Sequence, residues 1–233
     1  MKKKGRVKNW LINILCLILL IVGLALIFNK QIQNFIVGKQ SDTYQLNKVT
    51  REEIVKNQEK EAEFDFDKVE SMDLEAVLRA RYENEPLPVI GNISVPNVNM
   101  RLPIFKGVSN TSLLFGAGTM KPEQRMGKGN YGLASHRMID PTLLFSPIIN
   151  IQKNDKIYLT DLDKVYVYEA FYMDYIPATK VEVIEDVEDE TLVTLITCDT
   201  TGTNRFCVQG KLVDSYDFSN DKKELADIFD LNN

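Results

Sequence analysis

The sequence predicts a mainly β domain that follows an N-terminal membrane helix. From Leu87 onward, short β-rich runs are separated by Gly, Pro, Asn and Asp, and one long apolar run lies near the N-terminus. Valine and tyrosine alternate in Val165–Tyr168, which is the period-two pattern of a strand with two different faces. Many short strands with only short helical inserts favour a mainly antiparallel barrel or sandwich.

Composition limits the possible partners. The chain has 233 residues, of which 44% are hydrophobic, so it can form a globular core. Five of its 28 Lys and Arg residues precede the first apolar run, which leaves 23 basic against 33 acidic residues in the rest. These five are Lys2, Lys3, Lys4, Arg6 and Lys8. An acidic body argues against a nucleic-acid partner, because phosphate binding needs a basic face.

Residues 10–28 predict a transmembrane signal anchor. The run WLINILCLILLIVGLALIF has one polar interruption, Asn13, and at ~1.5 Å per residue a helix of this length nearly spans a ~30 Å hydrocarbon core. The basic cluster before it keeps residues 1–9 cytoplasmic and exports the rest. A cleaved signal peptide is the alternative, since Gly23–Ala25 offers small residues, but the apolar run is long for such a peptide.

The exported part divides into a stalk and a folded domain. Residues 29–63 are polar and charged, so we expect an extracellular stalk that is helical around REEIVKNQEKEAE. The domain is expected over residues 64–233, with the barrel from about residue 87. Its first segment, residues 64–81, spaces apolar side chains on one helical face, and the tail NDKKELADIF predicts a short terminal helix.

Metal and phosphate sites are not expected. The chain has one histidine, His136, and three cysteines, Cys16, Cys198 and Cys207, with no C-x-x-C spacing. The segment GAGTMKPEQRMGKGN lacks the G-x-x-x-x-G-K-[ST] pattern of a phosphate loop. No G-x-S-x-G motif of a serine hydrolase occurs either.

Cys198 ends the apolar run TLITC and can be a packing residue, a disulfide partner, a metal ligand or a nucleophile. If residues 193–198 and 205–213 are consecutive antiparallel strands, Arg205 lies near Cys198 at one end of the sheet. A guanidinium there stabilises a thiolate and can donate to a developing oxyanion. A nucleophilic thiol also needs a base, and His136 is the only imidazole in the chain.

The second exported cysteine, Cys207, lies two residues beyond Arg205 on the same strand face and has apolar neighbours. We expect it to be a small buried residue. A disulfide between Cys198 and Cys207 stays open as an alternative, since their spacing permits it.

These motifs resemble those of class A sortases, the cysteine transpeptidases of Gram-positive bacteria. The similarity rests on TLITC at 194–198 with an Arg before the next strand, on LASH at 133–136, and on the N-terminal anchor, and it spans about residues 87–213. It implies an eight-stranded closed β-barrel with short helices. It also implies that Cys198 is the nucleophile, His136 the general acid and base, and Arg205 the residue that stabilises substrate and oxyanion, with Thr197 helping to hold the oxyanion.

The same resemblance implies the substrates. Cys198 would cleave an LPXTG-type sorting signal of a surface protein between Thr and Gly, forming a thioester that an amine of a lipid-linked peptidoglycan precursor then resolves. The signal's Leu and Pro would bind a groove lined by Ala134, Val181, Val183, Ile184 and Ile196.

Some members of this family bind calcium through acidic residues in the loop before the histidine strand. Here that loop carries Lys121, Gln124 and Lys128. We therefore expect no cofactor and no calcium dependence, with a fixed lysine in place of the ion.

Two other functions stay open. The first is a membrane-tethered extracellular binding or structural β-barrel, in which Cys198 is only buried or disulfide-bonded. The second is a pilus-assembling sortase with a lysine side chain as acceptor. Such enzymes often carry a lid and a second C-terminal anchor, and neither is obvious in this sequence.

Overall fold

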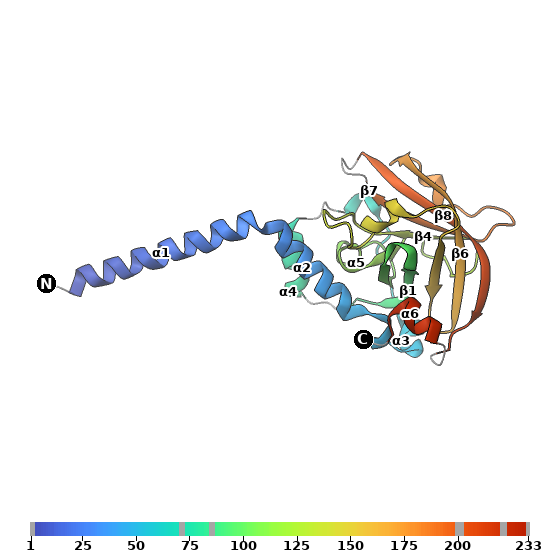
Figure 1. Ribbon diagram of the computed structural model, residues 1–233, viewed down its shortest axis with the longest axis horizontal. Coiled ribbons are helices and arrows are strands. Elements are labelled where there is room, and N and C mark those ends of the chain that lie inside the picture. Colours follow the sequence, from blue (N-terminus) through green and yellow to red (C-terminus); the bar gives the residue numbers. More distant parts are fainter. Residues whose placement is uncertain (1–2, 70–72, 84–86, 199–202, 220–222, 232–233) are drawn as a thin grey trace.

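The computed structural model describes residues 3–69, 73–83, 87–198, 203–219 and 223–231. Its α-helices are α1 (Lys3–Ile27), α2 (Asn29–Ser41), α3 (Arg51–Gln58), α4 (Leu74–Glu83), α5 (Asn110–Phe115) and α6 (Lys223–Phe229). Its strands are β1 (Val89–Val95), β2 (Met100–Phe105), β3 (Ala117–Thr119), β4 (Asn130–Ala134), β5 (Lys156–Thr160), β6 (Lys164–Pro177), β7 (Leu192–Cys198) and β8 (Asn204–Asp217). Figure 1 shows a long N-terminal helix that leads into a β-barrel with short helices around it.

The strands close into a barrel in the order β1-β2-β3-β4-β7-β8-β6-β5. Six neighbouring pairs are antiparallel, while β2–β3 and β4–β7 are parallel. The predicted eight-stranded closed barrel is therefore confirmed. The parallel β4–β7 pair matters most for function, because it brings together two chain segments that lie about sixty residues apart.

The sequence did not reveal β3. In the run TSLLFGAG only the first part is helical. Ser109 caps α5 by accepting from the backbone N–H of Ser112 at 3.2 Å, and β3 follows directly after Gly116. A strand of three residues is too short to show an alternating pattern.

Part of the segment expected as a stalk packs on the barrel. Val37, Leu46 and Ile54 are buried, and α3 begins with a capping box in which Thr50 and Glu53 exchange hydrogen bonds. These few apolar residues lie far apart in a polar sequence, so composition alone hid them. The packed fold therefore begins before residue 64, and the helix expected over 64–81 starts only at Leu74.

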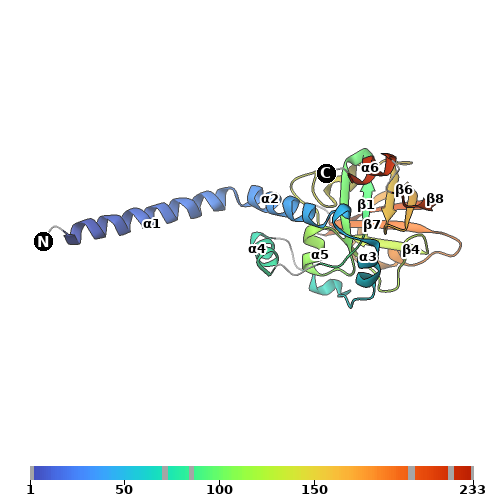
Figure 2. The same cartoon turned by 90° about the horizontal axis from the view of Figure 1, so that it is seen from below.

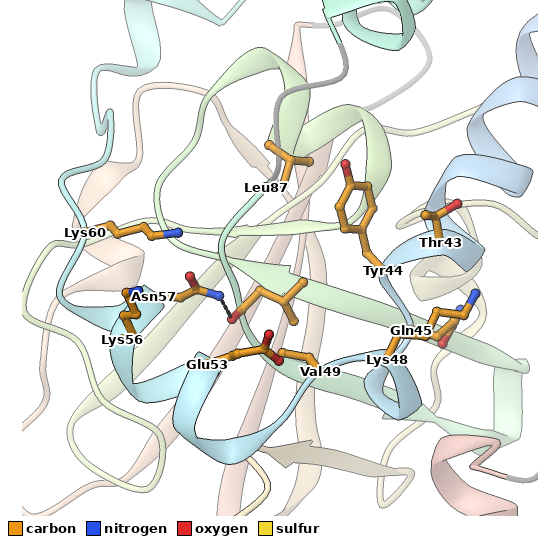
Figure 3. Close-up of a pocket in the computed structure, with 11 residues that line it drawn as sticks. Thr43, Tyr44, Gln45, Lys48, Val49, Glu53, Lys56, Asn57, Lys60 and Leu87 are labelled. Carbon is orange, nitrogen blue, oxygen red and sulfur yellow. Dashed lines mark hydrogen bonds between the residues drawn. The ribbon is translucent and has the colours of Figure 1, made fainter.

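A hollow of about 330 Å³ remains where this N-terminal segment crosses the barrel. Figure 3 shows Tyr44, Glu53 and Leu87 around it, and Asn57 donating from its side-chain amide to the backbone oxygen of Val89 at 2.9 Å. This bond and the buried Ile54 fasten α3 to β1.

The barrel interior is filled by aliphatic side chains. Examples with no exposed surface are Ile93, Ile104, Leu133, Leu159, Leu195 and Val208. At the other face of β1, Ser94 donates its hydroxyl to the backbone oxygen of Ile228 at 2.6 Å, so the predicted C-terminal helix, α6, lies against the barrel. This closed, filled core gives β4, β7 and β8 fixed positions.

Candidate active site

The strand registers bring the predicted catalytic residues together. Cys198, the last residue of β7, pairs directly with Arg205, the second residue of β8. On the other side of β7, Ala134 of β4 pairs with Ile196 in parallel register. Continuing this register by two residues places His136 beside Cys198. Cys198 therefore lies between Arg205 on one neighbouring strand and His136, which directly follows the other.

The connection between β7 and β8 was expected to be a loop at residues 199–204. Residues 199–202 lie outside the described residues, while β8 already begins at Asn204. The predicted antiparallel pairing of the two strands is confirmed by seven residue pairs, from Leu192–Lys211 to Cys198–Arg205. The Arg205 side chain is half-buried and donates from Nη1 to the backbone oxygen of Asn204 at 3.2 Å.

His136 is held by the backbone on both sides. The N–H of Ser135 donates to Ile196 at 3.3 Å, and the carbonyl of His136 accepts from the N–H of Phe145 at 3.1 Å. The imidazole is half-buried, and its burial lowers the pKa of His136 to about 4. The ring is therefore neutral at neutral pH, the form that can accept a proton from a thiol.

Thr197 is the neighbour of Cys198 on β7, and its hydroxyl helps to fix this strand. Successive side chains of a strand point to opposite faces, so the Thr197 side chain points away from Cys198. It is buried, and its hydroxyl donates to the backbone oxygen of Ser135 at 2.8 Å. This bond joins β7 to the chain just before His136, and the part of Thr197 in holding an oxyanion stays a prediction.

An apolar cluster lies on the same face of β7 and β8 as Cys198. Ile196 and Cys207 form a directly opposed pair, and both are buried. Val183 and Ile184, from the 3-10 turn Val181–Ile184 after β6, pack against them. Three of the residues predicted to line the groove, Val183, Ile184 and Ile196, therefore meet.

The other two predicted groove residues differ from one another. Ala134 is half-buried and pairs with Ile196, so it borders the same face. Val181 is 69% exposed and lies outside the packed cluster. The sequence analysis missed Met120, Tyr172 and Ile176, which join this cluster. Tyr172 and Ile176 are four residues apart on β6, a spacing that places them on one face and could have indicated them.

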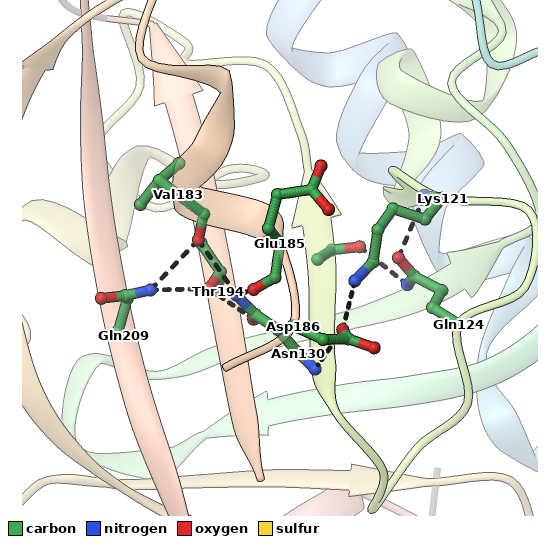
Figure 4. A network of polar contacts seen from close by, with 9 residues as sticks. Lys121, Gln124, Asn130, Val183, Glu185, Asp186, Thr194 and Gln209 are labelled. Carbon is green, nitrogen blue, oxygen red and sulfur yellow. Dashed lines mark hydrogen bonds and ion pairs between the residues drawn. The ribbon is translucent and has the colours of Figure 1, made fainter. Parts of the chain in front are cut away.

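A polar network fastens the loop after β6 at the far end of this face (Figure 4). The Asn130 side-chain amide donates to the backbone oxygens of Val183 and Glu185, both at 3.0 Å, and its oxygen accepts from Thr194 at 2.7 Å. Gln209 donates to the Thr194 hydroxyl and to the Val183 oxygen, both at 3.2 Å. Strands β4, β7 and β8 thus all hold the loop that carries Val183 and Ile184.

An ion pair extends this network to the loop before β4. Lys121 Nζ lies 2.6 Å from Asp186 Oδ1, which also accepts from the backbone N–H of Asn130 at 2.9 Å. Both bonds lower the pKa of Asp186, the lysine contributing most. A Cβ at Gly129 would lie 2.6 Å from the Asp186 carboxylate, and the φ of Gly129 is +53°, so a larger residue there would displace the pair.

Comparison with known proteins identifies the family. Residues 93–213 match the Sortase domain family. The chain belongs to the sortase family. It is 41% identical to "Sortase A" of Streptococcus agalactiae over 227 residues, covering 95% of this chain and 91% of that protein. It is 42% identical to "Sortase A" of Listeria monocytogenes over 200 residues, covering 85% of this chain and 90% of that protein.

The solved structure of Listeria monocytogenes sortase A superposes with a TM-score of 0.58 at 43% identity, covering 62% of this chain and 99% of that structure. The predicted resemblance to class A sortases is thereby confirmed. The protein is a cysteine transpeptidase of the sortase type, whose class acts on LPXTG-type sorting signals. These findings do not favour the alternative of a non-catalytic barrel.

Cys198 and Cys207 of this sortase have clearly different surroundings. All three cysteines of the chain are free thiols, so the open alternative of a Cys198–Cys207 disulfide is not what the structure shows. Cys207 faces Ile196 rather than Cys198, is fully buried, and has its pKa raised to about 12 by burial. It is a packing residue, as predicted, although it packs in the groove cluster and not in the barrel interior. Cys198 is half-exposed.

Within the described residues, no group of three or more His, Cys, Asp or Glu side chains is placed to hold a metal ion. In the loop before β4, Lys121 instead places an ammonium group next to Asp186.

Proposed function

We propose that this sortase is a membrane-anchored transpeptidase in which Cys198 attacks the Thr–Gly bond of an LPXTG-type signal. The observation that carries this proposal is the placement of His136, Cys198 and Arg205 across three adjacent chain segments. Because burial lowers the pKa of His136 to about 4, the resting imidazole is neutral and takes the proton of the thiol as sulfur attacks the threonine carbonyl.

The same proton then leaves with the product. The tetrahedral intermediate carries a negative oxygen, which the Arg205 guanidinium is placed to stabilise. The C–N bond to glycine breaks, the protonated His136 gives its proton to the leaving amine, and a thioester on Cys198 remains. An incoming amine attacks this thioester and forms the new C–N bond, and neutral His136 accepts a proton from that amine. The C–S bond then breaks, and the protonated His136 returns the proton to the sulfur, which restores the Cys198 thiol.

The apolar face next to Cys198 supports the choice of substrate. Ile196, Val183 and Ile184 offer a dry surface to Leu and Pro of an extended signal, with Ala134 at its border. An extended peptide can lie along the strand face with alternate side chains in contact. Val181, which is exposed, would reach the signal only at the outer end of the loop.

The anchor supports the choice of acceptor. In α1, Asn9–Ile27 has a mean hydropathy of 2.9 and is long enough to cross a bilayer. Basic residues before it favour a cytoplasmic N-terminus and an extracellular catalytic domain. The acceptor is then the amine of a lipid-linked peptidoglycan precursor, which lies in the same membrane. We propose catalysis without calcium, the Lys121–Asp186 pair holding the loops instead.

Peptide cleavage with and without an added amine tests this proposal. An LPXTG peptide should give a Thr–amine product when the amine is present, and a thioester on Cys198 should be detected as a mass increase of the intact protein. Cys198→Ala should abolish the Thr–amine product and the thioester, whereas the matched variant Cys207→Ala should still form them. Turnover by Cys198→Ala, or a product that never contains the amine, would refute the mechanism.

A further inference from the structure

The membrane helix and the folded domain are joined without a flexible linker. Only Phe28 lies between α1 and α2, and helical hydrogen bonds run through it, from its N–H to Leu24 at 2.9 Å and from Ile32 to its own oxygen at 3.0 Å. Figure 1 shows α2 bending away from the axis of α1 at this point. The orientation of the domain relative to the membrane is thereby restricted.

Helix α4 occupies the space beside this bend. Its Val77 and Ala80 are buried, and Arg81 donates from Nη1 to the Gln40 side chain of α2 at 2.8 Å. In both views, α4 lies at the side of the folded domain from which α1 leaves (Figures 1 and 2). Together with α2, α4 therefore lies at the end of the domain that is next to the membrane helix.

The outward face of α4 is amphipathic. Leu78 is 49% exposed and Tyr82 is 91% exposed, and they are four residues apart, so they share one helical face. Glu75 and Arg79 are exposed on the same side of α4. On α2, Phe35 is 69% exposed and Lys39 lies over its ring at 5.9 Å. No acidic residue occurs in the chain before Asp42, although the chain as a whole is acidic.

From these observations we propose that α4, with the exposed side of α2, docks on the headgroup layer of the bilayer. Leu78 and Tyr82 insert at the interface, while Lys39 of α2 faces lipid phosphates. Headgroups extend roughly 5–8 Å beyond the hydrocarbon core on each side, which is the level at which a helix beside the end of α1 lies. Tyrosine favours this layer because its ring is apolar and its hydroxyl is polar.

This docking face rests on the proposed membrane anchoring and adds an orientation to it. The same α2 contacts the loop after His136, since a Cβ at Gly38 would lie 3.4 Å from Leu143 Cδ2. Docking would therefore hold the His136 side of the site at one height above the membrane. A lipid-linked amine would then meet the site at a fixed distance.

Single-tryptophan variants of the full chain in anionic phospholipid vesicles test the proposal. Trp10 is the only native tryptophan and lies in the membrane span, so in the unaltered protein its quenching by brominated lipid reports insertion of α1. In a Trp10→Phe background, Tyr82→Trp and Leu78→Trp each place the probe on α4. Phe171→Trp is the matched control, since Phe171 is 47% exposed on β6, far from α4 (Figure 1). Cleavage of an LPXTG peptide shows that each variant is folded.

Lipids with a spin-labelled headgroup should quench the tryptophans at positions 78 and 82 at least about twofold more strongly than the one at 171, because quenching requires contact with the headgroup layer. Lys39→Glu should weaken that quenching in anionic vesicles. Equal quenching at 78, 82 and 171, with Trp10 still quenched in the native chain, would overturn the docking face but leave the anchor intact. Loss of Trp10 quenching would instead refute the anchor.

Discussion

The two ends of the β7–β8 face differ in how they use their polar groups. At one end, Thr194 and Gln209 bond to each other, and with Asn130 they hold the loop after β6 in place. At the other end, Cys198 faces Arg205, and the thiol is half-exposed. One pair of strands thus provides a fastened end and a reactive end, about four residues apart along each strand.

This difference shows how a reactive thiol can lie on a rigid surface. The hydrogen bonds are concentrated where they fix the groove, while the reactive group remains accessible. Cys207 illustrates the same rule, because the identical side chain two residues from Arg205 is buried, and burial raises its pKa to about 12. Position on the face, rather than residue type, thus sets the exposure of each cysteine, and we propose that the exposed one, Cys198, is the nucleophile.

The largest contrast is expected between the two cysteines. Cys198→Ala should lower kcat/KM by about 10⁴-fold or more, because the covalent step is lost. Cys207→Ala should stay close to native turnover and lose about 1–3 kcal/mol of stability through a small cavity. Iodoacetamide labelling followed by peptide mass mapping should modify Cys198 first. Faster labelling of Cys207 would contradict the distinction.

Arg205 should give the next largest effect. Arg205→Ala should lower kcat/KM by about 10²–10³-fold, since a donor to the developing oxyanion is removed. Arg205→Lys should recover part of this loss, because the charge remains but the planar fork does not. Steady-state cleavage of an LPXTG peptide measures both, and native activity of the alanine variant would exclude the proposed role.

His136 should make stability depend on pH. Its folded pKa, about 4, lies below the unfolded value of about 6.5, so the unfolded chain binds the proton more tightly between these values. The contribution of His136 to the free energy of unfolding is therefore complete above pH ~6.5 and decreases as the pH drops toward 4. The total decrease is at most about 3 kcal/mol, and it is smaller if solvent reaches the ring.

Two measurements test this. NMR titration of the only histidine, in the Cys198→Ala variant, should give a midpoint well below 6.5. The free energy of unfolding of His136→Gln, measured with urea, should lack this part of the pH dependence. A titration midpoint at or above 6.5 would show that the ring is not desolvated.

At the fastened end, Thr194→Val should lower the free energy of unfolding by about 1–3 kcal/mol, because Asn130 and Gln209 each lose a buried hydrogen-bond partner. The loop that carries Val183 would loosen, so KM for the peptide should rise more than kcat falls. Ser215→Ala removes an exposed hydroxyl from the same strand as Gln209 and should have little effect on either. If Thr194→Val lowered kcat alone, the network would act on the reactive end instead.

The smallest effect is expected at Lys121. Its pair with Asp186 is partly exposed, so Lys121→Met should lower the free energy of unfolding by no more than about 1 kcal/mol and raise KM for the peptide slightly. Lys128→Met is the control, because Lys128 is exposed in the same loop. Calcium or a chelator should change native kcat/KM by less than about twofold, because an ammonium already lies beside the carboxylate. Strong activation by calcium would contradict the proposed exchange of ion for lysine.

The sequence predicted the reactive end better than the fastened end. Cys198 and Arg205 are close in the chain and flank a turn, so their pairing followed from a simple hairpin. The network could not be predicted, because Asn130, Thr194 and Gln209 come from three strands and nothing in the sequence links them. The bond from the Thr197 hydroxyl to Ser135 could not be predicted for a related reason, because Ser135 follows a different strand. The buried Val37 and Ile54 were missed because their neighbours are polar.

The parallel pairing of β4 with β7 also bears on when activity begins. Thr197 and Ser135, which join β7 to the segment that carries His136, are 62 residues apart, so their contact forms only after a long loop has closed. Before this contact forms, Cys198 would be an ordinary thiol without the proposed base and oxyanion donor. Completion of the barrel would then assemble all three groups at once, so the enzyme would become reactive only as a finished fold.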